Sequence, residues 1–302
     1  MTKHDIQLVE KNEKIALLIE EAALKGTRRA ERYPERKFFG YFCSYWPEEL
    51  VLAAGLEPLR ILPPSARGTP AELPAYCCSL ARVSLFMSNT GSFQDLAGVG
   101  FAHTCDTMQC LGGIWAGTTQ NNTTPVIVPV ILNAPGAKKY YAAELESLLL
   151  QLGQLAGSEP GDAELNRALE LCSRIRSLAT ELDGLRDKLP SPLVPALLRA
   201  SQVMPRDVYA GTLEEAMPAL RNQAREQPDR QRVLLSGAVL ENDSLYEMIE
   251  ELGGRVVADD TCTGFRHFAA APEAEIPGAP LEKIVSRYMT MPPCPCRNRG
   301  GE

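Results

Sequence analysis

Cysteines beside expected strand and helix ends are the residues of this chain most able to do chemistry. Cys105 stands between a small, Gly-rich apolar stretch, 96–101, and a run that predicts a helix, 111–115. A strand-to-helix junction offers backbone N–H groups and the positive end of the helix dipole, and both favour a thiolate. A thiolate in that position can bind a metal ion or cluster.

Cys105 belongs to a larger set of thiols. Eight of the nine cysteines lie near expected loop or element ends, among Pro, Gly, Ser, Thr and Asp, and this placement indicates ligands more than core filler. The ninth is surrounded by helix-forming residues, so we expect it to pack as a small hydrophobe. The eight are Cys43, Cys77, Cys78, Cys105, Cys110, Cys262, Cys294 and Cys296, and the ninth is Cys172.

Composition limits the kind of protein. The chain has 302 residues, 45% of them hydrophobic, which is enough for two domains with cores of their own. The net charge is -7 and no basic block stands out, so nucleic acid is not expected as a main partner. The sequence has neither a signal-peptide core nor an apolar stretch of membrane-spanning length. We therefore expect a cytoplasmic protein, in which cysteines serve as metal, redox or core residues rather than disulfides.

The first half of the chain alternates between strand and helix patterns. Strands are expected at 37–43, 58–62, 96–101 and 125–132, the last a buried run of sequence PVIVPVIL. Helices are expected from Ser44 to a C-cap at Gly55, over 79–87, and from about 106 onward. This alternation predicts a parallel α/β domain.

The rest of the chain predicts a helical region and then a second α/β unit. Leucines recur at helical spacing through 138–226, and strands at 232–236 and 255–258 flank a helix at 243–252. The expected fold is α/β, with two flavodoxin/Rossmann-like parallel-sheet domains joined by a helical region, the second domain being incomplete. The division is an N-terminal helix (1–36), a first α/β domain (37–137), the helical region (138–228) and a partial second α/β domain (229–302).

The candidate ligands differ in how well they are placed. Cys43, at a strand end before a helix, is favourable for a thiolate. Cys110 is five residues beyond Cys105, which puts it off the same helix face, so we expect a packed thiol or one outside the ligand set. Cys262 stands in an Asp-Asp-Thr-Cys-Thr-Gly turn, which is equally consistent with an Asx-turn that caps the next element. Cys294-Pro-Cys296 lacks the two-residue spacing common in zinc sites.

Other polar residues have structural explanations beside functional ones. Glu48 and Glu49 suit the positive end of a helix dipole as well as a catalytic role. His103 could hydrogen-bond a substrate or cluster, although such a histidine is more often structural. Arg266 and His267 could bind a carboxylate or phosphate, or lie in a solvated loop. The sequence has neither a phosphate-binding Walker A motif nor a dinucleotide fingerprint, so ATP or a dinucleotide is not an expected ligand.

Four blocks of this sequence resemble the D-component proteins of 2-hydroxyacyl-CoA dehydratases and benzoyl-CoA reductases, a family that includes the double-cubane cluster proteins. They occur in the family's order. The blocks are Gly40-Tyr-Phe-Cys-Ser-Tyr-Trp-Pro-Glu-Glu-Leu-Val-Leu-Ala-Ala-Gly55, Cys78-Ser-Leu-Ala-Arg82, Thr104-Cys-Asp-Thr-Met-Gln109, and Arg232-Val-Leu-Leu-Ser-Gly237 with Asp259-Asp-Thr-Cys-Thr-Gly-Phe-Arg266. The resemblance implies two facing α/β domains that hold a four-iron four-sulfur or double-cubane cluster. It implies cluster ligation by Cys78 and Cys105, with Cys43, Cys262 and Cys294 or Cys296 as further candidates.

Thiol ligands and only three histidines favour iron–sulfur over zinc, although a zinc site of separated cysteines is an alternative. The resemblance also implies partners: an ATP-dependent activator that delivers one low-potential electron, a homologous subunit and an acyl-CoA substrate. In a dehydratase that electron enters the thioester carbonyl, and the resulting ketyl radical anion expels the hydroxyl. The alternatives are a double-cubane reductase of small molecules and a non-catalytic, shortened relative. Catalytic side chains are not identified.

The family usually continues beyond the Cys-Pro-Cys block with further strands and another cysteine ligand, whereas this sequence stops at Glu302. We therefore expect the last part of the second domain to be missing. A sheet of two strands leaves edge groups unpaired and apolar faces uncovered. The expectation is a chain that is unstable as a monomer. It pairs through residues 232–288 with itself or with a full-length homologue, or else shows fast amide exchange in that region.

Overall fold

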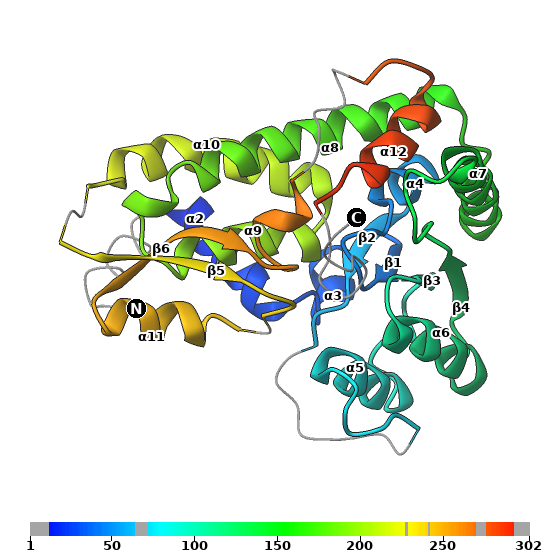
Figure 1. Cartoon of the computed structure of the whole chain (residues 1–302), viewed down its shortest axis with the longest axis horizontal. Helices are drawn as coiled ribbons and strands as arrows, with labels where there is room; N and C mark the ends of the chain where they lie inside the picture. The colour runs from blue at the N-terminus through cyan, green and yellow to red at the C-terminus, as the bar shows by residue number, and fades with distance from the viewer. Residues whose placement is uncertain (1–11, 64–71, 227–228, 241, 270–275, 293–302) are drawn as a thin grey trace. The chain divides into compact units, whose positions relative to one another are not determined.

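The computed structural model describes residues 12–63, 72–226, 229–240, 242–269 and 276–292 (Figure 1). The chain divides into two compact units, each of which draws on separate parts of the sequence. The four-strand unit consists of Thr27–Ser173 and Ala270–Glu302, and the two-strand unit of Met1–Gly26 and Arg174–Ala269. The α/β class expected from the sequence is confirmed, whereas the division into four consecutive domains remains a proposal.

A parallel sheet organises the four-strand unit. Its strand order is β2-β1-β3-β4, so the first strand of the chain lies between the second and the third. Tyr41 of β1 aligns with Arg60 of β2 and with Gly100 of β3. Since all four strands run in one direction, their carboxyl ends meet at one edge of the sheet. The strands are β1 Phe38–Tyr41, β2 Glu57–Arg60, β3 Gly98–Ala102 and β4 Asn122–Val126.

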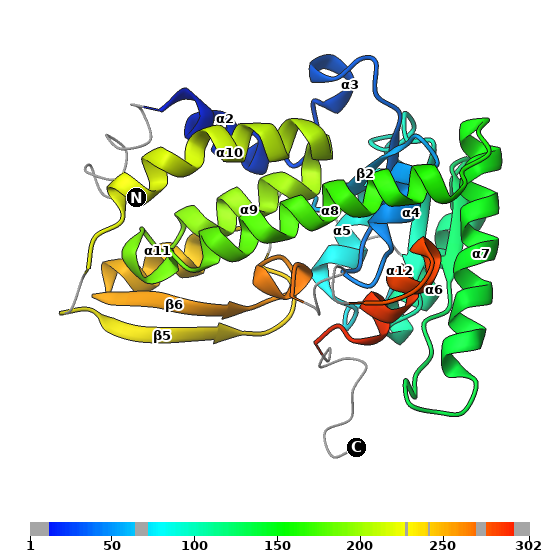
Figure 2. The same ribbon diagram turned by 90° about the horizontal axis from the view of Figure 1, so that it is seen from above.

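Helices cover both faces of this sheet, as Figures 1 and 2 show. Phe39 and Tyr41 belong to the core that includes side chains of α4, α7 and α12. Phe101 instead packs edge-on against Trp115 of α6, with ring centroids 5.7 Å apart. Burial on both faces explains why β1 and β3 read as nearly continuous apolar runs. The helices are α3 Arg29–Arg32, α4 Glu48–Ala53, α5 Ser79–Asn89, α6 Asp106–Thr118, α7 Ala137–Ala156 and α12 Pro280–Met289.

Gly100 has a specific packing role in β3. A Cβ atom at this position would overlap the indole ring of Trp46. Trp46 is fully buried and stacks on Phe39, with centroids 5.6 Å apart. The glycine therefore lets the segment that follows β1 lie directly against β3. This close approach fixes the loop that carries Cys43.

The prediction of a buried strand at 125–132 is wrong. The strand is β4, Asn122–Val126, and the residues after it leave the sheet. Ile127, Val130 and Ile131 are exposed. The sequence contains Pro125 and Pro129, which cannot donate to a ladder, and proline is confined to edge strands such as β4. Apolar composition alone had suggested a longer, buried strand.

The two-strand unit combines helices with two parallel strands. Val233 of β5 aligns with Val256 of β6, and the helix between them is α11, as the sequence predicts. All eleven residues of α9 are buried, which makes this helix the centre of the unit. Helix α8 begins in the four-strand unit and ends in this one. The elements are α2 Glu13–Leu24, α8 Asp162–Asp183, the 3-10 helix η1 Arg186–Lys188, α9 Leu193–Val203, α10 Arg206–Gln223, β5 Gln231–Ser236, α11 Ser244–Glu251, β6 Gly254–Asp260 and the 3-10 helix η2 Phe265–His267.

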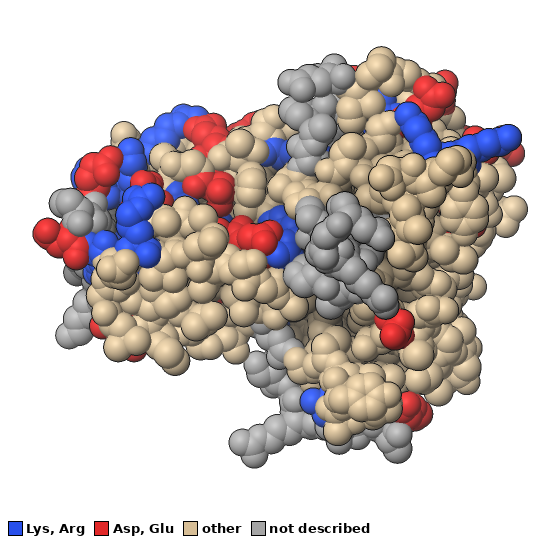
Figure 3. All heavy atoms as spheres, in the orientation of Figure 1, with Lys and Arg blue, Asp and Glu red and all other residues tan. Residues whose placement is uncertain are grey.

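The surface of the two-strand unit carries mixed charges. Figure 3 shows acidic and basic side chains side by side over this part of the molecule. Ion pairs of this unit include Arg174 with Glu214 and Arg221 with Glu181. Within the described residues, none of the helices is both long enough and apolar enough to cross a membrane.

Candidate functional site

Two of the expected ligands follow neighbouring strands at one edge of the four-strand sheet. Cys43 comes two residues after the end of β1, and Cys105 comes three residues after the end of β3. β1 and β3 are hydrogen-bonded neighbours, so both thiols belong to the same carboxyl edge. Thr104 connects the two loops, because its hydroxyl donates to the Cys43 sulfur at 3.3 Å. The structure thus brings the Cys43 loop against the residue next to Cys105.

Cys78 and Cys105 both begin helices. Cys78 is the N-cap of α5 and Cys105 is the N-cap of α6, and these two helices contact each other. In these described helices, neither sulfur takes a capping hydrogen bond from the first turn. The positive end of a helix dipole favours a thiolate at such positions. The two thiols thus lie at the first residues of two neighbouring helices.

The vicinal pair Cys77-Cys78 separates clearly by burial. Cys77 is buried and Cys78 is exposed, and the choice of Cys78 as the candidate ligand stays a prediction. Cys172 is buried on α8, so its expected role as a packed residue is confirmed. Cys110 is exposed on α6, so the first of its two expected roles, a packed thiol, is wrong, and the second, a thiol outside the ligand set, stays a prediction. It lies five residues beyond Cys105, on the side of α6 that faces solvent.

The remaining candidate ligands lie outside the described part of the four-strand unit. Cys262 lies in the two-strand unit, just after β6. Cys294 and Cys296 lie outside the described residues. Among the described His, Cys, Asp and Glu side chains, groups of three that could hold a metal ion do not occur. Thiols are the ligands that iron–sulfur clusters use, and a cluster with four cysteine ligands would need more cysteines than Cys43 and Cys105.

Cys262 has a charged environment. The Arg266 guanidinium lies 3.6 Å from its sulfur and also donates to the Asp260 carboxylate at 2.6 and 2.7 Å. Arg266 is buried, so the solvated-loop interpretation is wrong, and the carboxylate that it binds belongs to the chain itself. Its hydrogen bonds hold the pKa of Asp260 below the ordinary value of 3.8. Asp260 in turn raises the pKa of Arg266.

Asp259 forms a second group of interactions at the end of β6. Its carboxylate accepts hydrogen bonds from the Tyr246 hydroxyl and the Thr261 backbone N–H, both at 2.9 Å. The fully buried Arg186 lies 3.5 Å from the same carboxylate and donates to Asp183 at 2.7 Å. Burial raises the pKa of Tyr246 and that of Asp183. These carboxylates are held by partners, which makes them structural groups.

Glu48 and Glu49 are bound inside the four-strand unit. The Tyr288 hydroxyl donates to Glu49 at 2.8 Å, and the Arg287 guanidinium is 3.8 Å from the same carboxylate. Glu48 accepts a hydrogen bond from the Tyr41 hydroxyl. The helix dipole is thus only part of their role, because Glu49 attaches α12 to α4. His103 is half-buried, and its backbone N–H donates to Val126 across the sheet.

Sequence reasoning missed Thr104 as a partner of a thiol, and it missed the Arg186–Asp259 pair. Thr104 adjoins Cys105 in the sequence, but its contact with Cys43 depends on how β1 and β3 align. Arg186 and Asp259 are 73 positions apart, 259 minus 186, and nothing local marks them as a pair. The sequence shows only an Arg in a charged turn, Asp183-Gly-Leu-Arg-Asp-Lys188, and an Asp-Asp pair at a strand end.

The comparisons with known proteins agree on one group. A family model described as 2-hydroxyglutaryl-CoA dehydratase, D-component, matches residues 43–302. The chain is 24% identical over 261 residues to the (R)-phenyllactyl-CoA dehydratase beta subunit of Clostridium sporogenes, covering 84% of this chain and 69% of the relative. It is 28% identical over 273 residues to a benzoyl-CoA reductase subunit of Thauera aromatica, covering 86% and 69%. The beta subunit of lactoyl-CoA dehydratase from Anaerotignum propionicum is 26% identical over 267 residues, covering 84% and 69%.

Proposed function

Because the chain belongs to the 2-hydroxyglutaryl-CoA dehydratase D-component family, we propose that it is the iron–sulfur subunit of a 2-hydroxyacyl-CoA dehydratase-type enzyme. Members of this family are dehydratases, which are lyases, and reductases that act on acyl-CoA. The proposed reaction is the removal of water from a 2-hydroxyacyl-CoA. It requires a homologous partner subunit and an ATP-dependent activator as the source of the electron.

The observation that carries this proposal is the pair of thiol-bearing loops at one sheet edge. Cys43 and Cys105 follow adjacent parallel strands, and Thr104 hydrogen-bonds across the gap between their loops. Ligands of α/β proteins bind outside the carboxyl ends of such strands. The thiol chemistry, the position at the carboxyl edge and the family all support the proposal of a cofactor site here.

The proposed ligands are Cys43, Cys78 and Cys105, with Cys262 and Cys294 or Cys296 as further candidates. When bound, the cluster supplies one-electron transfer at low potential. The chain's own contribution is to position these sulfurs and to control their surroundings. The Thr104 hydroxyl donates toward the Cys43 sulfur, and hydrogen bonds to ligating sulfur tune reduction potential. Trp46 and Phe101, which lie three and four residues from Cys43 and Cys105 in the sequence, are fully buried.

Reduction of an acyl-CoA is the second candidate. The benzoyl-CoA reductase relative matches this chain at 28% identity, within the same range as the dehydratase subunits. The same thiol edge would serve either reaction, since both need a low-potential electron at a thioester. Product analysis separates them: a dehydratase releases water from a hydroxylated substrate, and a reductase adds electrons and protons to an unsaturated one.

The test is anaerobic purification of the full chain with iron, sulfide and zinc analysis and an absorption spectrum. The proposal predicts a brown protein that contains both iron and acid-labile sulfide and has broad thiolate-to-iron absorption in the visible range. A colourless protein with stoichiometric zinc would contradict it. Turnover of 2-hydroxyacyl-CoA with a homologous subunit and activator then tests the reaction itself.

A further inference from the structure

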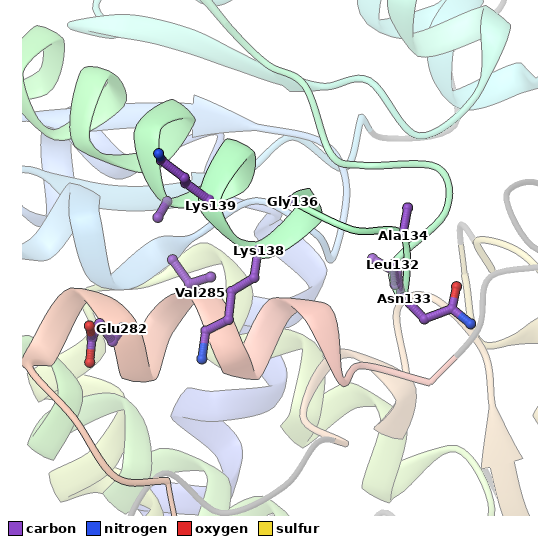
Figure 4. A pocket seen from close by; sticks show the side chains of 9 residues that line it. Leu132, Asn133, Ala134, Gly136, Lys138, Lys139, Glu282 and Val285 are labelled. Carbon is purple, nitrogen blue, oxygen red and sulfur yellow. The ribbon is translucent and has the colours of Figure 1, made fainter.

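A cavity of about 550 Å³ opens in the four-strand unit beside the start of α7. Its volume is within the range of small-molecule sites, about 300–1,000 Å³. The walls include the apolar side chains of Leu132 and Val285 and the charged side chains of Lys138, Lys139 and Glu282. Figure 4 shows these residues contributed by the segment before α7, by α7 and by α12. The cavity thus combines apolar surface with an excess of one positive charge.

The two lysines differ in direction. In Figure 4 the Lys138 side chain reaches from the first turn of α7 toward α12, whereas Lys139 points away from α12. Both side chains are exposed, and within the described residues neither forms an ion pair. In particular, the Lys138 amino group lines the same cavity as Glu282 without pairing with it. Lys138 is therefore available to a ligand that enters from solvent.

The cavity lies on the segment that leaves the carboxyl end of β4. That strand is a neighbour of β3, which leads to Cys105, and β3 is a neighbour of β1, which leads to Cys43. Adjacent strands are about 4.8 Å apart, so the ends of β1 and β4 are separated by about 10 Å across the sheet. The segment that leads from β4 to the cavity and the two thiol-bearing loops thus leave the sheet at the same edge. One extended ligand could therefore span from the cavity to the thiols.

We propose that this cavity binds the phosphate-bearing end of the acyl-CoA substrate, with Lys138 as the main phosphate contact. This inference rests on the proposed function, which supplies an acyl-CoA ligand. Coenzyme A carries phosphate groups and an adenine ring, matching the lysine and the apolar walls of the cavity. Phosphate oxygens accept charge-assisted hydrogen bonds from the Lys138 ammonium group. The thioester end of the same molecule then extends toward the thiol edge.

Calorimetric titration of the full, anaerobically purified chain tests this with three probes: coenzyme A, 3′-dephospho-coenzyme A and pantetheine. Affinity is expected to fall in that order as phosphate groups are removed. Lys138→Gln should weaken binding of coenzyme A by about fivefold, the upper range for an exposed charge pair. Lys139→Gln, which removes an equal charge that points away, should weaken it by less than about twofold. Lys283→Gln, on α12 but outside the cavity, should leave it unchanged.

A variant that is expected to strengthen binding shows that weaker binding by the lysine variants is not due to misfolding. Glu282 caps α12, since it accepts a hydrogen bond from the Ala279 backbone N–H at 3.3 Å, and glutamine can do the same. Glu282→Gln therefore preserves the cap while it removes the negative charge of the cavity. Binding of coenzyme A should become about twofold tighter. Weaker binding in this variant would contradict the assigned site.

Two outcomes overturn the inference, and neither is confused with failure of the proposed function. If Lys138→Gln binds coenzyme A as tightly as the wild-type protein does, the phosphates bind elsewhere. Wild-type protein that binds coenzyme A no better than pantetheine shows that phosphate is not recognised. In both cases the iron and sulfide content of the same samples reports on the proposed function independently.

Discussion

The two parallel sheets of this chain share a strand–helix–strand order, but different groups stand at their carboxyl edges. In the four-strand unit the loops after β1 and β3 carry the thiols of Cys43 and Cys105 above an aromatic core. In the two-strand unit the end of β6 carries Asp259 and Asp260, and buried arginines hold both carboxylates. Thiols are soft ligands that a cluster can use, whereas carboxylates paired with arginine are already occupied.

The two sheet edges also differ in the interactions that stabilise them. Packing supports the thiol edge, as in the contact between Trp46 and Gly100. Charge pairs support the end of β6, and charges removed from water are costly unless each has a partner. We therefore expect the two-strand unit to respond most to the loss of a single charge and the four-strand unit to respond most to a change of volume.

The largest expected effect is that of Asp259→Asn. This substitution keeps the side-chain volume but leaves the buried Arg186 guanidinium with less negative charge. Breaking a buried charge pair costs about 3 kcal/mol of unfolding free energy, measured by chemical denaturation. Asp187→Asn is the matched control, because its partner Arg232 is 69% exposed and 3.8 Å away. The control should cost less than about 1 kcal/mol. Equal costs would mean that burial of the pair is not what matters.

Two glycine-to-alanine substitutions test whether packing stabilises the four-strand unit. Gly100→Ala should destabilise the chain by about 2 kcal/mol, because the new methyl group must displace the ring of Trp46. Gly113→Ala should stabilise it by about 0.5 kcal/mol, because this exposed position on α6 has open space and alanine favours helix. Thermal unfolding of both variants gives the two signs. A neutral Gly100→Ala would show that the Trp46 segment can shift without cost.

The smallest effect concerns pH. Arg266 lowers the folded-state pKa of Asp260 below 3.8, so this pair adds stability above the unfolded pKa and loses it as pH falls through the folded pKa. Asp260→Asn should therefore lower stability at pH 7, and the difference from wild type should vanish in strong acid. The Asp260 side chain is 48% exposed, so screening keeps the difference below about 1 kcal/mol. Unfolding curves at pH 7 and below pH 3 measure this difference in stability. A difference that grows in acid would contradict the prediction.

Local sequence signals predicted most of the fold. The strand before Cys43, the helix that ends beside Gly55 and the burial of Cys172 all follow from apolar pattern and turn chemistry. Gly55 adopts φ +84°, the left-handed conformation that a helix end favours. The pattern failed beyond Val126, where β4 ends shortly before Pro129, a residue without an N–H for the ladder, and where Ile127, Val130 and Ile131 are exposed.

The site was predictable only as a set of candidate residues. Sequence position identified Cys78 and Cys105 beside helix starts, but it could not show that Thr104 reaches Cys43, since that contact depends on strand order. Arg266 and Asp260 are six residues apart, yet their pairing depends on how the turn after β6 folds back. Lys138 belongs to no motif, and only the direction of its side chain, toward α12, distinguishes it from Lys139, which lines the same cavity.

The central claim is that the thiols at strand and helix ends of the four-strand unit hold an iron–sulfur cluster. Its most direct test is iron per chain in anaerobically purified Cys105→Ala and Cys78→Ala, measured against Cys172→Ala as the matched control on a helix. The account predicts that the first two variants lose their cluster iron and that the third retains the wild-type amount. Equal iron content in all three, or equal loss from all three, would contradict it.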